Sequence, residues 1–159
     1  MAAKKILLTG GAGFIGSNFA RYLLNKYPEY KLVILDALTY AASIENLPTK
    51  LLPEGDGRVE FWYGNVCNAD LVLSCVEEVD AVVHFAAETH VTRSIHDNLL
   101  FFQTDVIGTQ TVANAVLKAG KKVGRFIHIS TSEVYGTAIG DLMTEDHPLN
   151  PMNPYASAK

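Results

Sequence analysis

Cysteine, long apolar runs and clusters of positive charge are all scarce in this sequence of 159 residues. Its two cysteines, Cys67 and Cys75, lack the close spacing of a zinc or redox site, and a domain of this size needs no disulfide, so we expect reduced thiols. The apolar run near the N-terminus, residues 6–8, is too short for a signal peptide or a membrane span. These absences predict a cytoplasmic protein with no metal site and no membrane partner.

The charge balance excludes a second group of partners. The 13 basic residues against 17 acidic residues give a net charge of −4, and no basic run is longer than two residues. Nucleic acids bind basic patches, so we expect no nucleic-acid partner, and an anionic ligand has to be bound by local geometry. The 48% of hydrophobic residues and 19% of charged residues instead predict one folded domain with a well-filled core.

Short apolar runs alternate along the chain with longer segments of helical periodicity. The runs predicted as strands are Lys5–Leu8, Lys31–Leu35, Val59–Tyr63, Ala81–Phe85 and Arg125–Ser130. The segments predicted as helices are Phe14–Lys26, Ala69–Glu78 and Asn98–Lys118, the last with Phe101, Phe102, Val106, Thr109, Val112 and Val116 on one side. Residues 37–58 are predicted to be a loop with a short helix. This order predicts an α/β fold with a doubly wound parallel sheet, which binds ligands beyond the carboxyl ends of its strands.

A glycine-rich turn follows the first predicted strand. Gly10, Gly13 and Gly16 lead into the first predicted helix, whose N-terminus presents unpaired N–H groups to a pyrophosphate. Asp36 ends the second predicted strand, where a carboxylate accepts hydrogen bonds from a ribose 2′-hydroxyl and repels a 2′-phosphate. No lysine or arginine occurs in residues 37–44 to neutralise such a phosphate, so the sequence favours NAD over NADP. The alternative role for Asp36 is an ordinary loop cap.

The ends of the third and fourth predicted strands carry further candidates. Asn65 and Val66 are placed to border an adenine, and the small side chains of Ala86 and Ala87 let the chain pass close to a cofactor. His90 follows, but a histidine at a strand end is more often structural or a substrate contact than a catalytic base. These residues are therefore predicted to line a pocket rather than to perform catalysis.

A tyrosine and a lysine four residues apart, Tyr155 and Lys159, follow the fifth predicted strand and a proline-rich loop. On a helix this spacing puts both side chains on one face, so that the ammonium lowers the pKa of the phenol and prepares it to take a proton. The segments 22–26 and 27–31 begin with tyrosine and end with lysine at the same spacing. Position selects the first pair, because it lies beside the expected nicotinamide.

These residues together make the chain resemble the extended short-chain dehydrogenase/reductase superfamily, and within it the nucleotide-sugar 4,6-dehydratases, most closely the dTDP-glucose 4,6-dehydratases. The segments that carry the resemblance are TGGAGFIGSNF, LDALTYAASIENL, HFAAETHVTRSI, TDVIGT, HISTSEVYG and NPYASAK. The resemblance implies that residues 1–159 form a Rossmann-like NAD-binding domain, without the last strands and the C-terminal substrate domain of the family. It also implies that the chain is a fragment of an enzyme, inactive in isolation, rather than a truncated binding protein.

The resemblance further implies roles for individual residues. NAD contacts are implied for Gly10, Gly13, Phe14, Ile15, Gly16, Asp36, Ala37, Leu38, Thr39, Asn65, Val66, Ala86, Ala87, Thr104, Tyr155 and Lys159. The residues implied to face the nucleotide sugar are Thr89, His90 and Thr131, and those implied to be catalytic are Thr131, Ser132, Glu133, Tyr155 and Lys159. In this scheme Tyr155 takes the proton of the sugar 4-hydroxyl while NAD takes the hydride, Glu133 takes the proton of carbon 5, and water leaves from carbon 6. A homodimer formed through helices is implied as the assembly.

Three positions depart from the family pattern. Ser132 stands where the dTDP-glucose enzymes usually have an aspartate that protonates the departing hydroxyl, and an alcohol is a poor proton donor near neutral pH. Asn65 and Thr92 also stand where aspartate is usual. Because the Thr-Ser-Glu order also occurs in GDP-mannose 4,6-dehydratases and UDP-glucuronate decarboxylases, those reactions remain alternatives, as do a nucleotide-sugar epimerase and a non-catalytic dinucleotide-binding module. Glu133 argues against a simple 4-epimerase, which needs no base at carbon 5.

Overall fold

Five parallel strands form the sheet at the centre of the computed structural model, which describes residues 4–47, 57–140 and 142–159. The strands are β1 (Lys5–Thr9), β2 (Lys31–Asp36), β3 (Val59–Tyr63), β4 (Ala81–His84) and β5 (Arg125–His128), in the spatial order β3-β2-β1-β4-β5. Each pair of neighbours is parallel. The predicted doubly wound fold is confirmed, and each strand matches its predicted segment to within two residues.

The winding of the sheet reverses at β1, which lies between β2 and β4. In the register of the sheet, Ile6 of β1 pairs with Leu32 of β2 on one side and with Ala81 of β4 on the other. The chain therefore builds outward from β1 first in one direction and then in the opposite one. Open α/β sheets bind their ligands at such a reversal, beyond the carboxyl ends of the strands.

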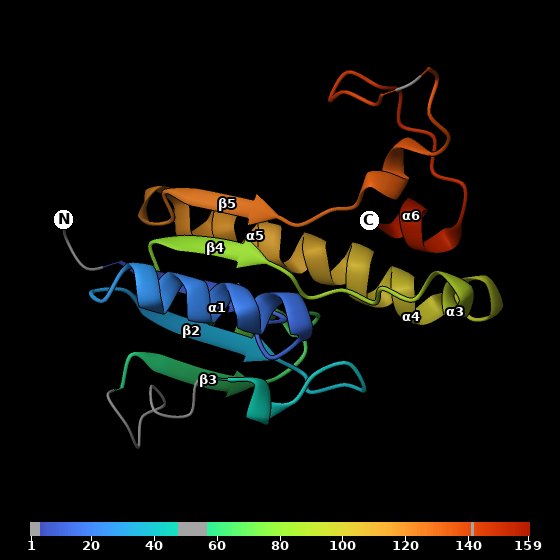
Figure 1. Cartoon of the computed structure of the whole chain (residues 1–159). Helices are drawn as coiled ribbons and strands as arrows, with labels where there is room; N and C mark the ends of the chain where they lie inside the picture. The colour runs from blue at the N-terminus through green and yellow to red at the C-terminus, as the bar shows by residue number, and fades with distance from the viewer. Residues whose placement is uncertain (1–3, 48–56, 141) are drawn as a thin grey trace.

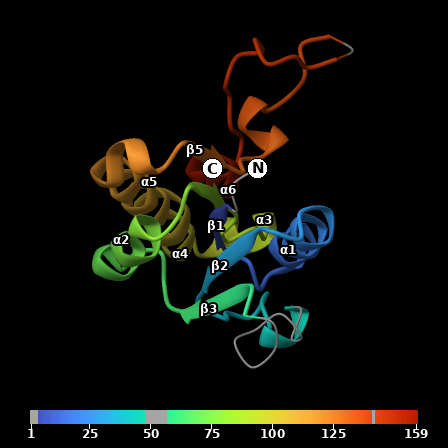
Figure 2. The same cartoon turned by 90° about the vertical axis from the view of Figure 1, so that its left-hand side faces the viewer.

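Helices cover both faces of the sheet (Figures 1 and 2). The covering helices are α1 (Phe14–Lys26) on one face and α2 (Ala69–Glu77) with α5 (Thr109–Ala119) on the other. Successive side chains of a strand point to opposite faces, so Ile6 and Leu8 of β1 pack in the core beneath α1 with Leu24. Leu7 points the other way and packs with Val112 of α5. The apolar strands are thus buried on both sides, as a parallel sheet requires.

The predicted helix over residues 98–118 is not one continuous α-helix. It consists of α4 (Leu99–Phe101), the π-helical segment η3 (Phe102–Gly108) and α5. A π-helical turn closes by i to i+5 hydrogen bonds and takes up more residues than an α-helical turn, which shifts the side chains around the axis. The prediction that Phe102 and Val106 lie on one side of the helix with Phe101 and Val112 is therefore wrong. Phe102 and Val106 are each 40% exposed, whereas Phe101 and Val112 are buried.

Several short elements gather at the carboxyl end of the sheet (Figure 1). They are η1 (Ile44–Asn46), α3 (Val91–His96), η5 (Ser132–Tyr135) and α6 (Pro154–Ala158). A further short turn, η4 (Gly120–Lys122), follows α5 and precedes β5. η1 is the short helix predicted in the loop after β2, and residues 48–56 of that loop lie outside the described part of the chain. Within the described residues, no helix has both the length and the apolar character needed to cross a membrane.

Candidate functional site

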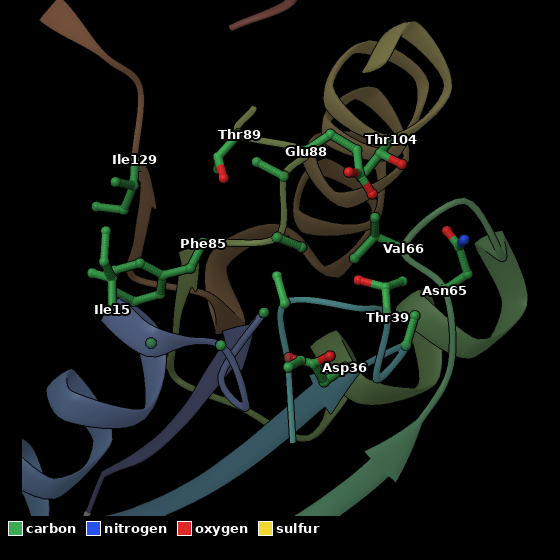
Figure 3. A pocket seen from close by; sticks show the side chains of 18 of the residues that line it. Ile15, Asp36, Thr39, Asn65, Val66, Phe85, Glu88, Thr89, Thr104 and Ile129 are labelled. Carbon is green, nitrogen blue, oxygen red and sulfur yellow. The ribbon is translucent and has the colours of Figure 1, made fainter. Parts of the chain in front are cut away.

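A pocket of about 500 Å³ lies at the carboxyl ends of the strands (Figure 3). Many of the residues predicted to bind a cofactor line this pocket. They are Gly10, Gly13, Phe14, Ile15, Gly16, Asp36, Ala37, Thr39, Asn65, Val66, Ala86, Ala87, Thr104, Tyr155 and Lys159. Thr89, predicted to face a substrate, lines the same pocket. The predicted site residues that do not line the pocket are Leu38, His90, Thr131, Ser132 and Glu133. One cavity thus gathers all the predicted cofactor residues except Leu38.

The glycine turn brings the ends of β1 and β4 into close contact. Gly10 has a φ of +68°, and a Cβ atom there would lie 2.6 Å from the backbone nitrogen of Ala86. A Cβ atom at Gly16 would collide with the carbonyl oxygen of Gly10. After this turn α1 begins at Phe14 with no side-chain cap and no acidic residue in its first turn. Its first N–H groups therefore face the pocket as donors for an anion.

Asp36 braces the glycine turn from the end of β2. Its Oδ2 atom accepts a hydrogen bond of 2.9 Å from the Ala12 N–H, and its Oδ1 atom accepts one of 2.8 Å from the Leu38 N–H. The capping role left open by the sequence is therefore present, and the carboxylate also lines the pocket, where each oxygen has a further lone pair for a ligand. Leu38, with a φ of 48°, packs its side chain against the core beneath α1, which explains its place outside the pocket wall.

The end of β3 forms another side of the pocket. Figure 3 shows Asn65 and Val66 near Thr39, which comes from the loop after β2. Asn65 uses its Oδ1 atom to accept a 2.8 Å hydrogen bond from the Cys67 N–H, which stabilises the turn after β3. Asn65 therefore has a structural role at the position where the family resemblance predicts an aspartate. Val66 presents an apolar surface to the pocket.

Tyr155 and Lys159 lie on the β5 side of the pocket, across the sheet from the end of β3. Asn153 caps the N-terminus of α6, because its Oδ1 atom accepts a 2.7 Å hydrogen bond from the Ala156 N–H, and Pro154 occupies the first helical position. Lys159 donates a 2.7 Å hydrogen bond from Nζ to the carbonyl oxygen of Ile129, just beyond β5. Burial lowers the pKa of Lys159, and the carboxylate of Asp105 acts in the opposite direction. The lysine is thus held in place at the pocket wall by the main chain of the sheet.

A second tyrosine–lysine pair with the same spacing, Tyr22 and Lys26 on α1, shows that spacing alone does not define this site. Lys26 donates a 2.7 Å hydrogen bond from Nζ to the hydroxyl oxygen of Tyr22, and this hydrogen bond raises the pKa of Lys26. Both residues are exposed on α1 and neither lines the pocket. Tyr155, by contrast, is 9% exposed and lines the pocket. The surroundings of the pair, rather than its sequence spacing, distinguish it.

Glu133 lies on η5, next to α6. The hydroxyl oxygen of Thr131 caps η5 by accepting a 3.3 Å hydrogen bond from the Glu133 N–H. Glu133 in turn accepts a 2.8 Å hydrogen bond at Oε2 from the side-chain amide of Asn153. Ser132 is exposed, and His90 begins α3 without a side-chain capping bond. The structure therefore holds the Glu133 carboxylate against the start of the helix that carries Tyr155, although Glu133 is not part of the pocket wall.

The structure adds residues to the pocket that the sequence did not single out. They are Leu35, Tyr40, Ala41, Ala42, Phe85, Glu88, Leu100, Ile129 and Ser130. Most of them adjoin a predicted position in the sequence, so extending each predicted segment by a few residues finds them. Tyr40 directly follows the predicted Thr39, whereas Leu100 carries no such signal. Tyr40 also contacts Arg93 of α3, whose guanidinium carbon lies 4.4 Å from the ring centroid, and no sequence pattern connects these two positions.

A buried histidine, His84, and a half-buried one, His128, support the sheet below the pocket. His84 is fully buried at the end of β4, where its ring nitrogens lie 2.6 Å from the hydroxyl of Thr9 and 2.9 Å from that of Thr109. Its ring stacks on that of His128, with the centroids 5.4 Å apart. Burial lowers the pKa of His84 to about 3 and also lowers the pKa of His128. Both rings are neutral at neutral pH and serve to join β1, β4, β5 and α5.

The chain matches known proteins over almost its whole length. The model of the GDP-mannose 4,6 dehydratase family matches residues 7–159. The chain is 48% identical to the low-salt glycan biosynthesis protein Agl12 of Haloferax volcanii, over 97% of the chain and 48% of the relative. It is 43% identical to a dTDP-glucose 4,6-dehydratase of Streptomyces antibioticus, over 97% of the chain and 45% of the relative.

A solved structure gives the same result. The dTDP-glucose 4,6-dehydratase DesIV of Streptomyces venezuelae, crystallised with NAD bound, superposes with a TM-score of 0.88 at 45% identity. The match covers 98% of this chain and 48% of that one. The chain therefore spans about half the length of the relatives that it matches.

Proposed function

The chain belongs to the GDP-mannose 4,6-dehydratase family, and from this premise we propose that the protein is an NAD-dependent nucleotide-sugar 4,6-dehydratase. It converts dTDP-glucose, or a related nucleotide-linked hexose, to the 4-keto-6-deoxy sugar. Residues 1–159 belong to its NAD-binding Rossmann domain, and a further domain binds the sugar. The observation that carries the proposal is the 2.8 Å hydrogen bond that fixes Glu133 to Asn153 at the start of the helix of Tyr155. A redox site needs the tyrosine, whereas elimination also needs a base beside it.

The residues of the pocket fit a dinucleotide. The first N–H groups of α1 are free to bind the pyrophosphate, and the absence of Cβ atoms at Gly10 and Gly16 keeps the backbone accessible. Asp36 is placed to accept hydrogen bonds from the ribose hydroxyls. Phe14 and Ile15 line the pocket and are 80% and 63% exposed, an apolar surface that a bound cofactor covers. When bound, NAD supplies the acceptor for a hydride from the sugar and returns it later in the cycle.

The residues at the Tyr155 end perform the proton transfers. Tyr155 takes the proton of the sugar 4-hydroxyl, the ammonium of Lys159 stabilises the phenolate, and Thr131 orients the hydroxyl. Oxidation at carbon 4 makes the proton on carbon 5 more acidic, and Glu133 takes it. The hydroxyl on carbon 6 leaves as water after receiving a proton. Because Ser132 is a poor acid, Glu133 returns to this hydroxyl the proton that it took from carbon 5.

The order Thr131, Ser132, Glu133 is also compatible with a second reaction. A serine between the threonine and the glutamate is also compatible with a UDP-glucuronate decarboxylase, which loses carbon dioxide instead of water. A nucleotide-sugar epimerase needs only the oxidation and reduction, and a non-catalytic dinucleotide-binding module needs neither Glu133 nor Lys159. The position of Glu133 favours the dehydratase over these last two.

The products of the full-length protein separate these functions. We would incubate it with dTDP-, UDP- and GDP-linked hexoses and with UDP-glucuronate, and analyse the products by mass spectrometry and by ¹H NMR, which distinguishes epimers. A 4-keto-6-deoxy sugar, recognised by the loss of one water, supports the dehydratase and also identifies the nucleotide. Carbon dioxide from UDP-glucuronate, an epimer of unchanged mass, or bound NAD without any product each assigns a different function.

We also propose that the full-length protein is a cytoplasmic homodimer. The exposed apolar residues on and between α4 and α5 that do not line the pocket are Leu99, Phe102, Val106, Ile107 and Leu117. A second copy packed on these helices covers them, as an obligate interface does. Both described cysteines are free thiols, as expected in a reducing compartment. Sedimentation equilibrium of the full-length protein tests the dimer, and a monomer at micromolar concentration contradicts it.

A further inference from the structure

The side chains of Tyr40 and Arg93 join two separate parts of the pocket wall. Tyr40 belongs to the loop after β2, lines the pocket and is 58% exposed. Arg93 belongs to α3, and its guanidinium carbon lies 4.4 Å from the centroid of the Tyr40 ring. Figure 3 shows Thr39, next to Tyr40, and Thr89, just before α3, on different parts of the wall. The contact therefore connects the segment after β2 with the segment after β4.

The loop that carries Tyr40 is held by its main chain. The Ala42 N–H donates a 3.1 Å hydrogen bond to the carbonyl oxygen of Thr39, which closes a turn around Tyr40. The Ser43 N–H donates a 3.2 Å hydrogen bond to the carbonyl oxygen of Ala12, in the glycine turn. The exposed ring of Tyr40 thus stands on a base that is fixed to the first turn of the pocket.

The helix that carries Arg93 is fixed to α6. Ser94, the next residue, is fully buried. Its hydroxyl donates a 2.6 Å hydrogen bond to the carbonyl oxygen of Val91 and accepts one of 3.2 Å from the Tyr155 N–H. This N–H lies in the first turn of α6, where a helix supplies no acceptor of its own. A continuous set of contacts therefore runs from the loop after β2, through Tyr40 and Arg93, to α3 and α6.

The contact between Tyr40 and Arg93 is a cation–π interaction. A guanidinium within about 6 Å of an aromatic centroid is attracted to the face of the ring. The guanidinium stays charged across the pH range in which proteins fold, and Arg93 forms no salt bridge within the described part of the chain. An exposed contact of this kind is weak. It therefore opens often enough to admit a ligand and, once closed, delays the departure of that ligand.

We propose that Tyr40 and Arg93 close over NAD bound in the pocket and slow its release. The pocket wall includes residues 39–42 on one side of the contact and residues 85–89 on the other, so a dinucleotide that fills the pocket lies between the two joined segments. The reason for retention rests on the proposed function, in which the hydride taken from the sugar returns to it in the same cycle. Loss of the reduced cofactor in mid-cycle would leave the oxidised sugar without its reductant.

Release of NAD from the full-length protein tests this pair. We would load the protein with NAD and mix it with excess alcohol dehydrogenase and ethanol, which convert released NAD to NADH and so report its dissociation rate by absorbance. Arg93→Gln and Tyr40→Leu should each release NAD roughly two- to fivefold faster than wild type, the range expected for an exposed cation–π contact. Tyr40→Phe keeps the face of the ring and should release NAD at the wild-type rate.

Lys26→Gln is the matched control. It removes a cation whose Nζ atom lies 5.2 Å from the centroid of the Tyr22 ring, on α1 and outside the pocket. Its release rate should equal that of wild type. Tyr40 and Arg93 are both exposed, so their substitution leaves the core intact, and thermal melts of each variant check this.

The double variant separates one shared contact from two independent effects. If Tyr40 and Arg93 act through each other, the double variant releases NAD no faster than the faster single variant, because either substitution already removes the contact. Effects that multiply in the double variant, or a wild-type rate in Arg93→Gln, overturn the proposal. The proposed function fails by a different result: a wild-type protein that makes no product from any nucleotide sugar contradicts the dehydratase, while the release rates still decide the role of the pair.

Discussion

The side chain of Asn153 joins two parts of the site. Its Nδ2 group donates a 2.8 Å hydrogen bond to Glu133 on η5, and its Oδ1 atom accepts a 2.7 Å hydrogen bond from the Ala156 N–H at the start of α6. The proposed base and the helix that carries Tyr155 are thus fixed to each other through one residue. A change in either contact should alter the distance between Glu133 and Tyr155, the two groups proposed to transfer protons.

Substitutions of Asn153 separate these two contacts. In Asn153→Asp the introduced carboxylate caps the helix as well as asparagine does but has no donor for Glu133. This variant should therefore keep its thermal stability and lose roughly ten- to hundredfold in kcat. Asn153→Ala loses the cap as well, at a cost of about 1 kcal/mol in the free energy of unfolding. Thermal melts and initial rates of the full-length protein measure both effects. Equal turnover in Asn153→Asp and wild type would contradict the role given to this donor.

Glu133→Gln should slow elimination far more than oxidation. The amide keeps the shape of the side chain but cannot take the proton from carbon 5, and loss of a general base costs roughly 10²- to 10⁴-fold. Reduced cofactor should then accumulate after substrate is added, visible as NADH absorbance in a stopped-flow experiment. Ser132→Ala is the control, because an exposed hydroxyl that transfers no proton can be removed with little effect. Unimpaired dehydration by Glu133→Gln would refute the assignment of the base.

Gly10 and Gly57 form a matched pair for the glycine turn. Their φ angles are +68° and +69°, but a Cβ atom at Gly10 would lie 2.6 Å from the Ala86 nitrogen, whereas one at Gly57 meets nothing within 4 Å. Gly57→Ala should therefore cost only the strain of a left-handed backbone, about 1–2 kcal/mol. Gly10→Ala adds a backbone collision and should lose more stability and the binding of NAD. Chemical denaturation measures the stability and titration measures the affinity for NAD. Equal losses in both variants would show that the close approach of Gly10 to the Ala86 backbone is unimportant.

Asp105→Asn should change how stability depends on pH. Folding raises the pKa of Asp105 from 3.8 to about 6, so the folded protein binds this proton more tightly than the unfolded chain does. The stabilisation that this provides is complete below about pH 4 and is lost as the pH rises through about 6, a change on the order of 3 kcal/mol. Asparagine does not titrate, so the variant should lack this fall and be more stable than wild type at neutral pH. Urea denaturation from acidic to mildly alkaline pH measures the free energy of unfolding of each protein, with Asp80→Asn as control because Asp80 is exposed. If the free energies of Asp105→Asn and wild type change with pH in parallel, the raised pKa of Asp105 is excluded.

The amino-acid sequence determined the order of the elements and the carboxyl end of the sheet as the place of the pocket. The apolar runs specify strands buried on both faces, and the glycines at 10, 13 and 16 with Asp36 specify the turn, because these are local properties of the chain. The family motifs identified Tyr155 and Lys159 for the same reason: their position after the fifth strand can be read from the sequence. A π-helical turn in place of a regular helix could not be predicted, because helical periodicity does not distinguish the two.

Only the tertiary structure decided which side chains face each other. Glu88 and Asp105 are each unremarkable acidic residues until burial removes their water and leaves two oxygens without partners. The equally spaced Tyr22 and Lys26 form a direct hydrogen bond, yet they stay in solvent, outside the pocket. Periodicity along a chain fixes the face on which a residue lies, whereas its pKa and its partners depend on residues that are distant in sequence and are brought close only by packing.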